Sequence, residues 1–203
     1  MSFLKNIDNS NYNLNNLTYK TFICKDCTKK DKDKEYEIIL DDSSPKDLKN
    51  FGYISVNYMK NPFVYVTTPL MVCLFGVNKK TNNMSLQFSN YKENNEMLNF
   101  LNFIKNIEFT QMKYLNLSED DTDLYISQIK YDKAGKYDPN LSVKIPFKYN
   151  KFECDIKNEN YSSMNIFNIN NFTKMQCDIY IDNIWKWNDK YICKWKCKKI
   201  YIL

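Results

Sequence analysis

Apolar and polar residues alternate along much of this chain, which is the pattern of half-buried β-strands. The alternation predicts strands at 35–40, 51–58, 63–66, 70–75, 84–88, 124–131, 142–147 and 152–156. Polar turn sequences, such as those at 41–45 and 78–83, separate these segments. We therefore expect a mainly β protein built from many short strands.

One segment follows a helical period instead. Between residues 97 and 107, apolar residues recur every three or four positions, and Asn94 or Asn95 can cap the start. A single helix among many short strands predicts a mainly β barrel or sandwich with one packed α-helix and loop decorations.

The C-terminal region predicts a β-hairpin, because two alternating runs flank the turn sequence Asn188-Asp189. The second run has an aromatic and thiol face, which we assign to the core, and a basic face. The first face holds Tyr191, Cys193, Trp195, Cys197 and Tyr201, and the second holds Lys194, Lys196 and Lys198. The lysine row is either a solvated edge or a track for phosphates. In the first run, Trp185 and Trp187 share a face that either stacks a ligand or enters the core.

Composition limits the class of protein. The 203 residues suit a single domain, 1–203, with residues 1–20 as a loose arm or an edge strand. Aromatic residues make up 16% of the chain, the net charge is +5, and all 29 basic residues are lysine. Basic clusters gather in the C-terminal half. The abundance of Asn, Lys and Ile matches AT-rich coding and carries little functional information.

The chain lacks residues and motifs that enzymes and metal sites commonly use. The chain has no His, no Gly-rich phosphate loop and no nucleophile elbow, so we expect no enzyme and no cofactor. The acidic run at 119–123 is typical of a solvated loop. Cys24 and Cys27 could pair with Cys193 and Cys197 around zinc, but their spacing is unfavourable, so we expect no metal.

Seven scattered cysteines without a signal peptide indicate a reducing, intracellular setting. The longest apolar run, 63–77, is interrupted and predicts no membrane span.

Lysine and tyrosine interleave repeatedly between residues 130 and 151. Single-stranded nucleic acid requires this combination, because cations follow the backbone while aromatic faces stack on bases at roughly 1–3 kcal/mol each. Ala134-Gly135 predicts a flexible turn within this stretch. The alternative interpretation is an ordinary β-rich surface in a chain biased towards Lys and Tyr.

Two groups of segments resemble a known family. The first is 67–77 with 84–89 and the helix, and the second is 137–146 with 184–196. The order and the sequences of these segments resemble those of the single-stranded-DNA-binding proteins of nucleocytoplasmic large DNA viruses. The barrels of that family resemble the phage type of OB-fold replication protein. The resemblance covers roughly residues 60–203. It departs at Ile192, where the family has Gly, and at the apolar C-terminal end, where phage-type relatives carry an acidic tail.

This resemblance implies an OB-fold-like β-barrel with its core at 60–203 and sequence-independent binding of single-stranded DNA, or of RNA. The implied role is viral DNA replication, recombination or repair, in the host cytoplasm or a viral factory, with the nucleus or virion as alternatives. Replication proteins and a second copy of the chain are expected partners, and a membrane is not. The expected contact residues are Lys130, Tyr131, Lys133, Lys136, Tyr137, Lys144, Lys148, Tyr149, Trp187, Lys194 and Lys196. The alternative function is a non-enzymatic structural or scaffold protein of a virion or viral factory.

Overall fold

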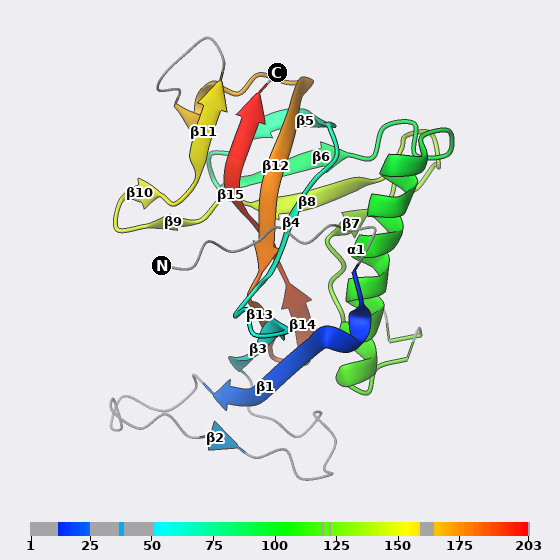
Figure 1. Cartoon of the computed structure of the whole chain (residues 1–203), viewed down its shortest axis with the longest axis vertical. Coiled ribbons are helices and arrows are strands. Elements are labelled where there is room, and N and C mark those ends of the chain that lie inside the picture. Colours follow the sequence, from blue (N-terminus) through cyan, green and yellow to red (C-terminus); the bar gives the residue numbers. More distant parts are fainter. Residues whose placement is uncertain are drawn as a thin grey trace.

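The computed structural model describes residues 12–24, 37–38, 51–118, 120–121, 123–158 and 165–202. It is mainly β, with a closed barrel, a second sheet and one long helix (Figure 1). Most predicted strands are confirmed. The part of the chain expected to form a loose arm or an edge strand is described only from Tyr12 onward. There, a 3-10 turn at Leu14–Asn16 leads into a strand that lies inside a sheet.

The barrel contains five strands: β5 (Met71–Val77), β6 (Asn83–Gln87), β8 (Asn140–Lys144), β12 (Thr173–Ile181) and β15 (Trp195–Ile202). Strand β5 pairs with β6, β6 with β8, and β12 with both β5 and β15, all antiparallel. A parallel pairing between β15 and β8 closes the ring. Counted in chain order, the strands follow each other around the barrel as 1-2-3-5-4. The expected OB-fold-like barrel is thereby confirmed.

Alternation along the strands fills the barrel. Met84, Leu86, Leu141 and Val143 point inward and are fully buried, while the residues between them face outward. The predicted core face of the C-terminal run is confirmed at Tyr191, Cys193, Trp195 and Cys197. Removing such apolar surface from water contributes about 25 cal/mol per Å².

The predicted place of Tyr201 on this core face is wrong, because β15 contains a register shift. Asp178 pairs with Lys199 but Ile179 pairs with Cys197, so one extra residue of β15 lies between them. A bulge of this kind reverses the alternation that follows it. Ile200 therefore enters the core, and the Tyr201 hydroxyl donates to the Asp178 carboxylate instead.

The second sheet has the order β14 (Lys190–Cys193), β13 (Asn183–Trp187), β3 (Phe51–Tyr58), β1 (Leu17–Cys24) and β2 (Glu37–Ile38). Strands β13 and β14 form the predicted hairpin, and Asn188 turns it with a φ of +52°. This hairpin is inserted between the barrel strands β12 and β15. The connection between the last two barrel strands therefore supplies two of the five strands of the second sheet.

Helix α1 (Asn95–Tyr114) lies in the chain between β6 and β8 and runs along one side of the molecule (Figure 1). Asn94 is its N-cap, because its side chain accepts a hydrogen bond from the Met97 amide at 3.2 Å. The helix buries an apolar stripe that includes Phe103, whose ring centroid lies 6.3 Å from that of Trp195. Among the described residues, no helix has both the length and the apolar character needed to cross a membrane.

The predicted strand at 124–131 is wrong except at β7 (Ile129–Lys130), which pairs with β8. The helix binds the preceding residues through side chains. Glu108 accepts hydrogen bonds from the Ser127 hydroxyl at 2.6 Å and the Gln128 amide at 2.7 Å, and Tyr125 donates to Gln111. Together with the backbone hydrogen bonds that join Leu124 and Ile126 to Tyr191, these bonds hold the segment that leads to residue 131 without a regular strand ladder.

Shorter elements complete the structure. Strand β4 (Val64–Thr67) pairs with β12, and β11 (Asp155–Asn158) runs parallel to β15. Strands β9 (Phe147–Lys148) and β10 (Lys151–Phe152) form a two-stranded ribbon, which projects from the side of the molecule opposite β7 (Figure 1). A second 3-10 turn, at Ile166–Asn168, precedes β12.

Candidate nucleic-acid interface

A groove of about 630 Å³ lies on the outer side of the barrel, across β5, β6 and β8. We call it the aromatic groove. Its lining comprises Leu74, Phe75, Gln87, Tyr131, Asp132, Tyr137, Asp138, Asn140 and Phe172. The four rings are between 57% and 70% exposed, although large aromatic side chains are usually buried. The outer face of the second and third strands is also where OB-folds bind oligonucleotides.

A bulge in β5 presents Phe75 to the groove. Cys73 pairs with Leu86 and Val77 with Met84, so two extra residues of β5 lie between these pairs. Gly76, at a φ of +63°, makes the bulge possible, because a Cβ there would lie 2.4 Å from the Ile169 carbonyl oxygen. Bulges re-aim side chains, and this one turns Phe75 away from the barrel interior.

Phe172 reaches the same groove through an unfavourable backbone conformation. Its φ is +62°, in the left-handed region that bulky residues avoid. Its amide donates to the Cys73 carbonyl at 2.7 Å, which ties it to the start of the β5 bulge. Such strain costs about 1–3 kcal/mol and is concentrated at functional sites. The structure holds this exposed ring in place at the expense of stability.

Tyr131 and Tyr137 come from the loop that joins β7 to β8. Asp132 shapes this loop, because one of its carboxylate oxygens accepts hydrogen bonds from the amides of Lys136 at 2.8 Å and Tyr137 at 3.3 Å. Gly135, at a φ of +66°, provides the turn that the sequence predicted. Asp138 accepts from the Asn90 amide at 2.7 Å and fixes the other end of the loop.

Lysines stand beside the aromatic groove, on the β7–β8 loop and on α1, and none is among the described residues that line it. Lys130, Lys133 and Lys136 are exposed on and beside the β7–β8 loop. The Lys136 ammonium lies 5.2 Å from the Tyr137 ring centroid, and the Lys105 ammonium on α1 lies 5.7 Å from that of Tyr131. The arrangement combines stacking surfaces with a rim of positive charge, which suits a polyanion with aromatic bases.

A strip of small polar side chains leads from the groove along the outer face of β6 and β8. Gln87 lies opposite Asn140, Ser85 opposite Ser142, and Asn83 opposite Lys144. At about 3.3 Å per residue, Lys144 is roughly 13 Å from Asn140. Lys144 donates to the Thr81 carbonyl, and its burial, together with the nearby Lys194, lowers its pKa. We call Lys144 and Lys194 the lysine pair.

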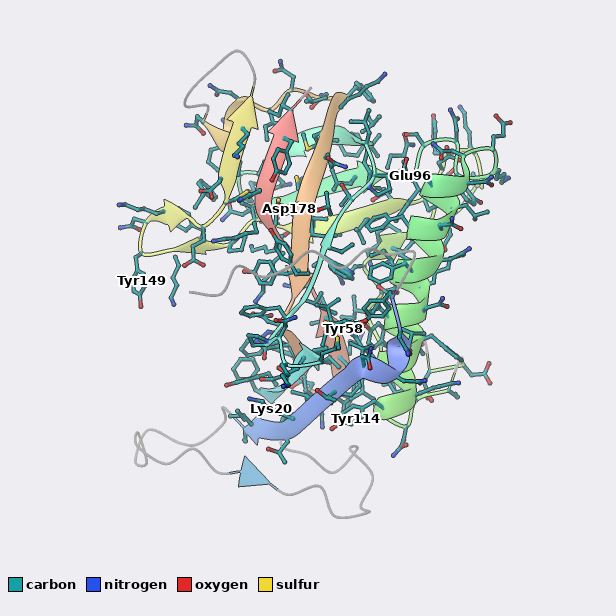
Figure 2. The ribbon with its side chains drawn as sticks, viewed as in Figure 1. Lys20, Tyr58, Glu96, Tyr114, Tyr149 and Asp178 are labelled. Carbon is teal, nitrogen blue, oxygen red and sulfur yellow. The ribbon has the colours of Figure 1, made fainter. Side chains whose placement is uncertain are left out.

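The remaining predicted residues lie elsewhere. Lys196 forms an ion pair with Asp182 at 2.6 Å, which occupies its charge. Lys148 and Tyr149 belong to the β9–β10 ribbon, where Tyr149 is 85% exposed at the tip (Figure 2). Trp187 is 66% exposed at the end of β13, in the second sheet. The eleven predicted residues therefore lie in four places. Five occupy the groove and its rim, and Lys144, Lys194 and Lys196 lie at the far end of β8 and the neighbouring start of β15. Lys148 and Tyr149 lie on the ribbon, and Trp187 lies on the second sheet.

Sequence reasoning missed eight residues of the groove and its rim: Leu74, Phe75, Gln87, Lys105, Asp132, Asp138, Asn140 and Phe172. A glycine inside a strand pattern often marks a bulge, so Gly76 was the available signal for Phe75. The sequence Asn170-Asn171 indicates a turn before Phe172 but does not reveal its left-handed backbone. Lys105 lies 26 residues from Tyr131 along the chain, and only the fold brings them together.

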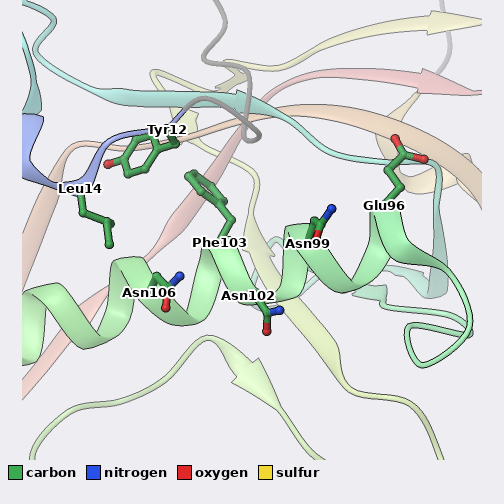
Figure 3. A pocket seen from close by; sticks show the side chains of 7 residues that line it. All are labelled: Tyr12, Leu14, Glu96, Asn99, Asn102, Phe103 and Asn106. Atoms are coloured by element: carbon green, nitrogen blue, oxygen red, sulfur yellow. The ribbon is translucent and has the colours of Figure 1, made fainter.

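A second hollow, of about 600 Å³, lies along α1 (Figure 3). Its helical wall carries Glu96, Asn99, Asn102 and Asn106, and Tyr12 lies opposite. The Tyr12 hydroxyl is buried without a hydrogen-bond partner among the described residues, and burial raises its pKa. Among the described residues, no lysine lines this hollow, and the one charged side chain that does is acidic. It is therefore a poor site for a polyanion.

The thiols of the described residues form no metal site. Cys24, Cys73, Cys154, Cys177, Cys193 and Cys197 are free, and burial raises the pKa of Cys193 and Cys197 well above the ordinary value. Within the described ranges, no group of three or more Cys, Asp or Glu residues is placed to hold a metal ion. Cys27, half of the zinc motif weighed from the sequence, lies outside those ranges.

Comparison with known proteins adds no assignment: neither a scan against protein-family models nor a search of curated proteins found a match for this chain.

Proposed function

We propose that this chain binds single-stranded DNA, with bases stacked in the aromatic groove and phosphates along the surrounding lysines. The observation that carries the proposal is the convergence of four exposed rings on one groove, two of them held there by a bulge and by a left-handed backbone. A structure that needed only stability would bury these rings or replace Phe172 with glycine.

The chemistry of the groove supports binding with tolerance for sequence. Every base has a face that can stack, and each base on an aromatic ring contributes about 1–3 kcal/mol. Lysine contacts phosphate as a point charge, without the bidentate geometry by which arginine reads guanine. The polar strip beyond the groove leads to the lysine pair, which extends the surface by about 13 Å for further nucleotides.

The proposed biological role follows from the family resemblance of residues 60–203. It is the protection or handling of single strands during viral DNA replication, recombination or repair. The OB-fold-like barrel supports this proposal, since such barrels present the face of their second and third strands to oligonucleotides. Proteins of the replication machinery are the expected partners.

A direct test measures fluorescence anisotropy of labelled oligo-dT at low salt. We expect salt-sensitive binding by the natural chain at micromolar protein or below. Replacing two groove tyrosines, Tyr131→Ala with Tyr137→Ala, should weaken binding at least about 30-fold, since two stacking contacts are lost. Tyr149→Ala removes a tyrosine outside the groove that is even more exposed, and it serves as the control. Absence of binding, or equal loss in both variants, would reject the proposal.

One observation favours the alternative function of a scaffold protein. The second sheet carries an aromatic ladder made of Phe51, Tyr53, Trp185 and Trp187, which is a surface suited to a protein partner. Under this alternative the chain self-assembles or co-purifies with capsid components and is indifferent to nucleic acid. Sedimentation analysis with and without oligo-dT separates the two functions.

A further inference from the structure

Two carboxylates line the aromatic groove, which is unexpected for a site that binds a polyanion. Asp132 and Asp138 are both half-buried in its wall, whereas the lysines stand on the rim. Carboxylate and phosphate repel each other, most strongly where water is partly excluded. In the proposed complex, the phosphodiester chain therefore follows the rim, and the edges of the bases point towards the two aspartates.

Each of these carboxylates has an oxygen to spare. In Asp132 and in Asp138, the Oδ2 atom accepts the backbone hydrogen bonds that shape the loop. Among the described residues, neither Oδ1 atom takes part in a hydrogen bond. A carboxylate oxygen accepts hydrogen bonds and offers none, so its complement in a ligand is an N–H group.

The floor of the groove supplies the opposite half of this pattern. Gln87 accepts a hydrogen bond from the Ser89 hydroxyl at 3.1 Å through its Oε1 atom, which leaves its amide nitrogen as a donor. A donor beside an acceptor matches the edge of cytosine, where an amino group adjoins ring and carbonyl acceptors. Uracil and thymine offer one N–H on this edge, at N3, and present a carbonyl oxygen where cytosine has its amino group. The amino group can donate two hydrogen bonds to the two spare carboxylate oxygens, whereas that carbonyl oxygen would face a carboxylate.

We propose that the aromatic groove prefers bases that carry an exocyclic amino group, with cytosine favoured over uracil or thymine, and that Asp132 and Asp138 are the residues that set this preference. The inference rests on the proposed function and refines it. Stacking accepts every base, whereas hydrogen bonds to the aspartates make the affinity differ from base to base. A cationic ligand fits the aspartates less well, since the ammonium groups of Lys105 and Lys136 already lie near two of the four rings.

The test compares oligo-dC with oligo-dU of the same length. The two bases have the same ring size, so their stacking area is nearly equal and their edges differ. At mildly alkaline pH, where oligo-dC stays single-stranded, we expect the natural chain to bind oligo-dC about three- to tenfold more tightly, the range expected for one added hydrogen bond.

The decisive variant is Asp132→Asn with Asp138→Asn. Asparagine keeps an oxygen for the backbone hydrogen bonds of the loop and replaces the spare acceptor with a donor. We expect it to abolish or reverse the preference for oligo-dC. Glu153→Gln with Asp155→Asn is the control for charge, because it also removes two carboxylates and both residues are exposed and do not line the groove. Circular dichroism and thermal melting establish that each variant is folded.

Each outcome bears on one level of the proposal. Equal affinity of the natural chain for oligo-dC and oligo-dU would overturn the base preference and leave single-strand binding intact. A preference that persists in the double variant would overturn the role of the aspartates. No binding to either oligonucleotide would overturn the proposed function itself, and the base preference with it.

Discussion

Two aromatic surfaces of this molecule, the aromatic groove on the barrel and the aromatic ladder on the second sheet, use similar side chains in different ways. In the ladder, rings pack on one another across neighbouring strands. The Trp185 ring centroid lies 5.7 Å from that of Phe51 and 5.0 Å from that of Tyr53. In the groove, no ring contact of this kind joins Phe75, Tyr131, Tyr137 and Phe172. The ammonium groups of Lys105 and Lys136 lie near the rings of Tyr131 and Tyr137 instead.

The difference separates rings that stabilise the fold from rings that are available to a ligand. The ladder follows the ordinary cross-strand register, in which Trp185 lies opposite Tyr53 and Trp187 opposite Phe51. Cross-strand aromatic pairs contribute to sheet stability. The groove instead relies on a bulge, a left-handed phenylalanine and a loop held by aspartates. Its construction weakens the fold locally, which is expected where a ligand supplies the missing contacts.

The largest expected effect comes from removing the two phenylalanines of the groove, Phe75→Ala with Phe172→Gly. Affinity for oligo-dT should fall at least about 30-fold, because two stacking surfaces are lost. Anisotropy titration measures the change. Trp187→Ala is the matched control, since Trp187 is 66% exposed, close to the 70% and 67% of the two phenylalanines. If Trp187→Ala weakens binding as much as the groove variant, the ladder also contacts DNA and the division between the two surfaces fails.

A substitution in the ladder should lower the stability of the fold and leave the affinity for oligo-dT unchanged. Trp185→Ala removes a half-buried ring that contacts both Phe51 and Tyr53, so we expect the free energy of unfolding to fall by about 2 kcal/mol. Urea denaturation followed by circular dichroism measures this loss, and the affinity of the folded variant for oligo-dT should be unchanged. Unchanged stability would mean that the ladder rings are held for a partner.

The contrast between these surfaces also shows how far sequence patterns reach. Period-two alternation identified β3, β6 and β8, and helical spacing with Asn94 identified α1, because regular elements repeat a local rule. Alternation failed at 124–131, where side chains of the helix hold the segment: Glu108 accepts from the Gln128 amide and Gln111 accepts from the Tyr125 hydroxyl. It failed at Tyr201 because one bulged residue reverses every later side chain.

The same limit applies to the site. Interleaved Lys and Tyr pointed to Tyr131 and Tyr137, which line the groove, and to Tyr149, which does not. Phe75 and Phe172 were not predicted, because a bulge and a left-handed residue both interrupt the two-residue alternation from which strands were predicted. Lys196 was predicted to contact phosphate, and its ion pair with Asp182 depends on the connection between β12 and β13. Local composition therefore suggested the chemistry, and tertiary geometry decided which residues share a surface.

A smaller effect concerns salt. Each lysine that contacts a phosphate of single-stranded DNA adds about 0.7 to the slope of log affinity against log salt. Lys105→Ala with Lys136→Ala should therefore reduce that slope by about 1.4 if both rim lysines contact the backbone. Lys196→Ala is the comparison, since its charge is already paired with Asp182, and it should leave the slope nearly unchanged. Equal slopes in all three proteins would remove the rim from the proposed interface.

The smallest expected effect separates strain from binding within a single residue. Phe172→Gly relieves a φ of +62° and removes a ring that buries little surface, so the variant should be more stable than the natural chain by about 1 kcal/mol. The same change should weaken oligo-dT binding, because one stacking surface is lost.

Tyr149→Gly relieves a similar φ of +49° on the ribbon, outside the groove, and should gain stability without losing affinity. Urea denaturation and anisotropy on the same two variants provide the comparison. A Phe172→Gly variant that gains stability and keeps full affinity would show that the strained ring has no part in binding DNA, and the main argument for the groove would then be lost.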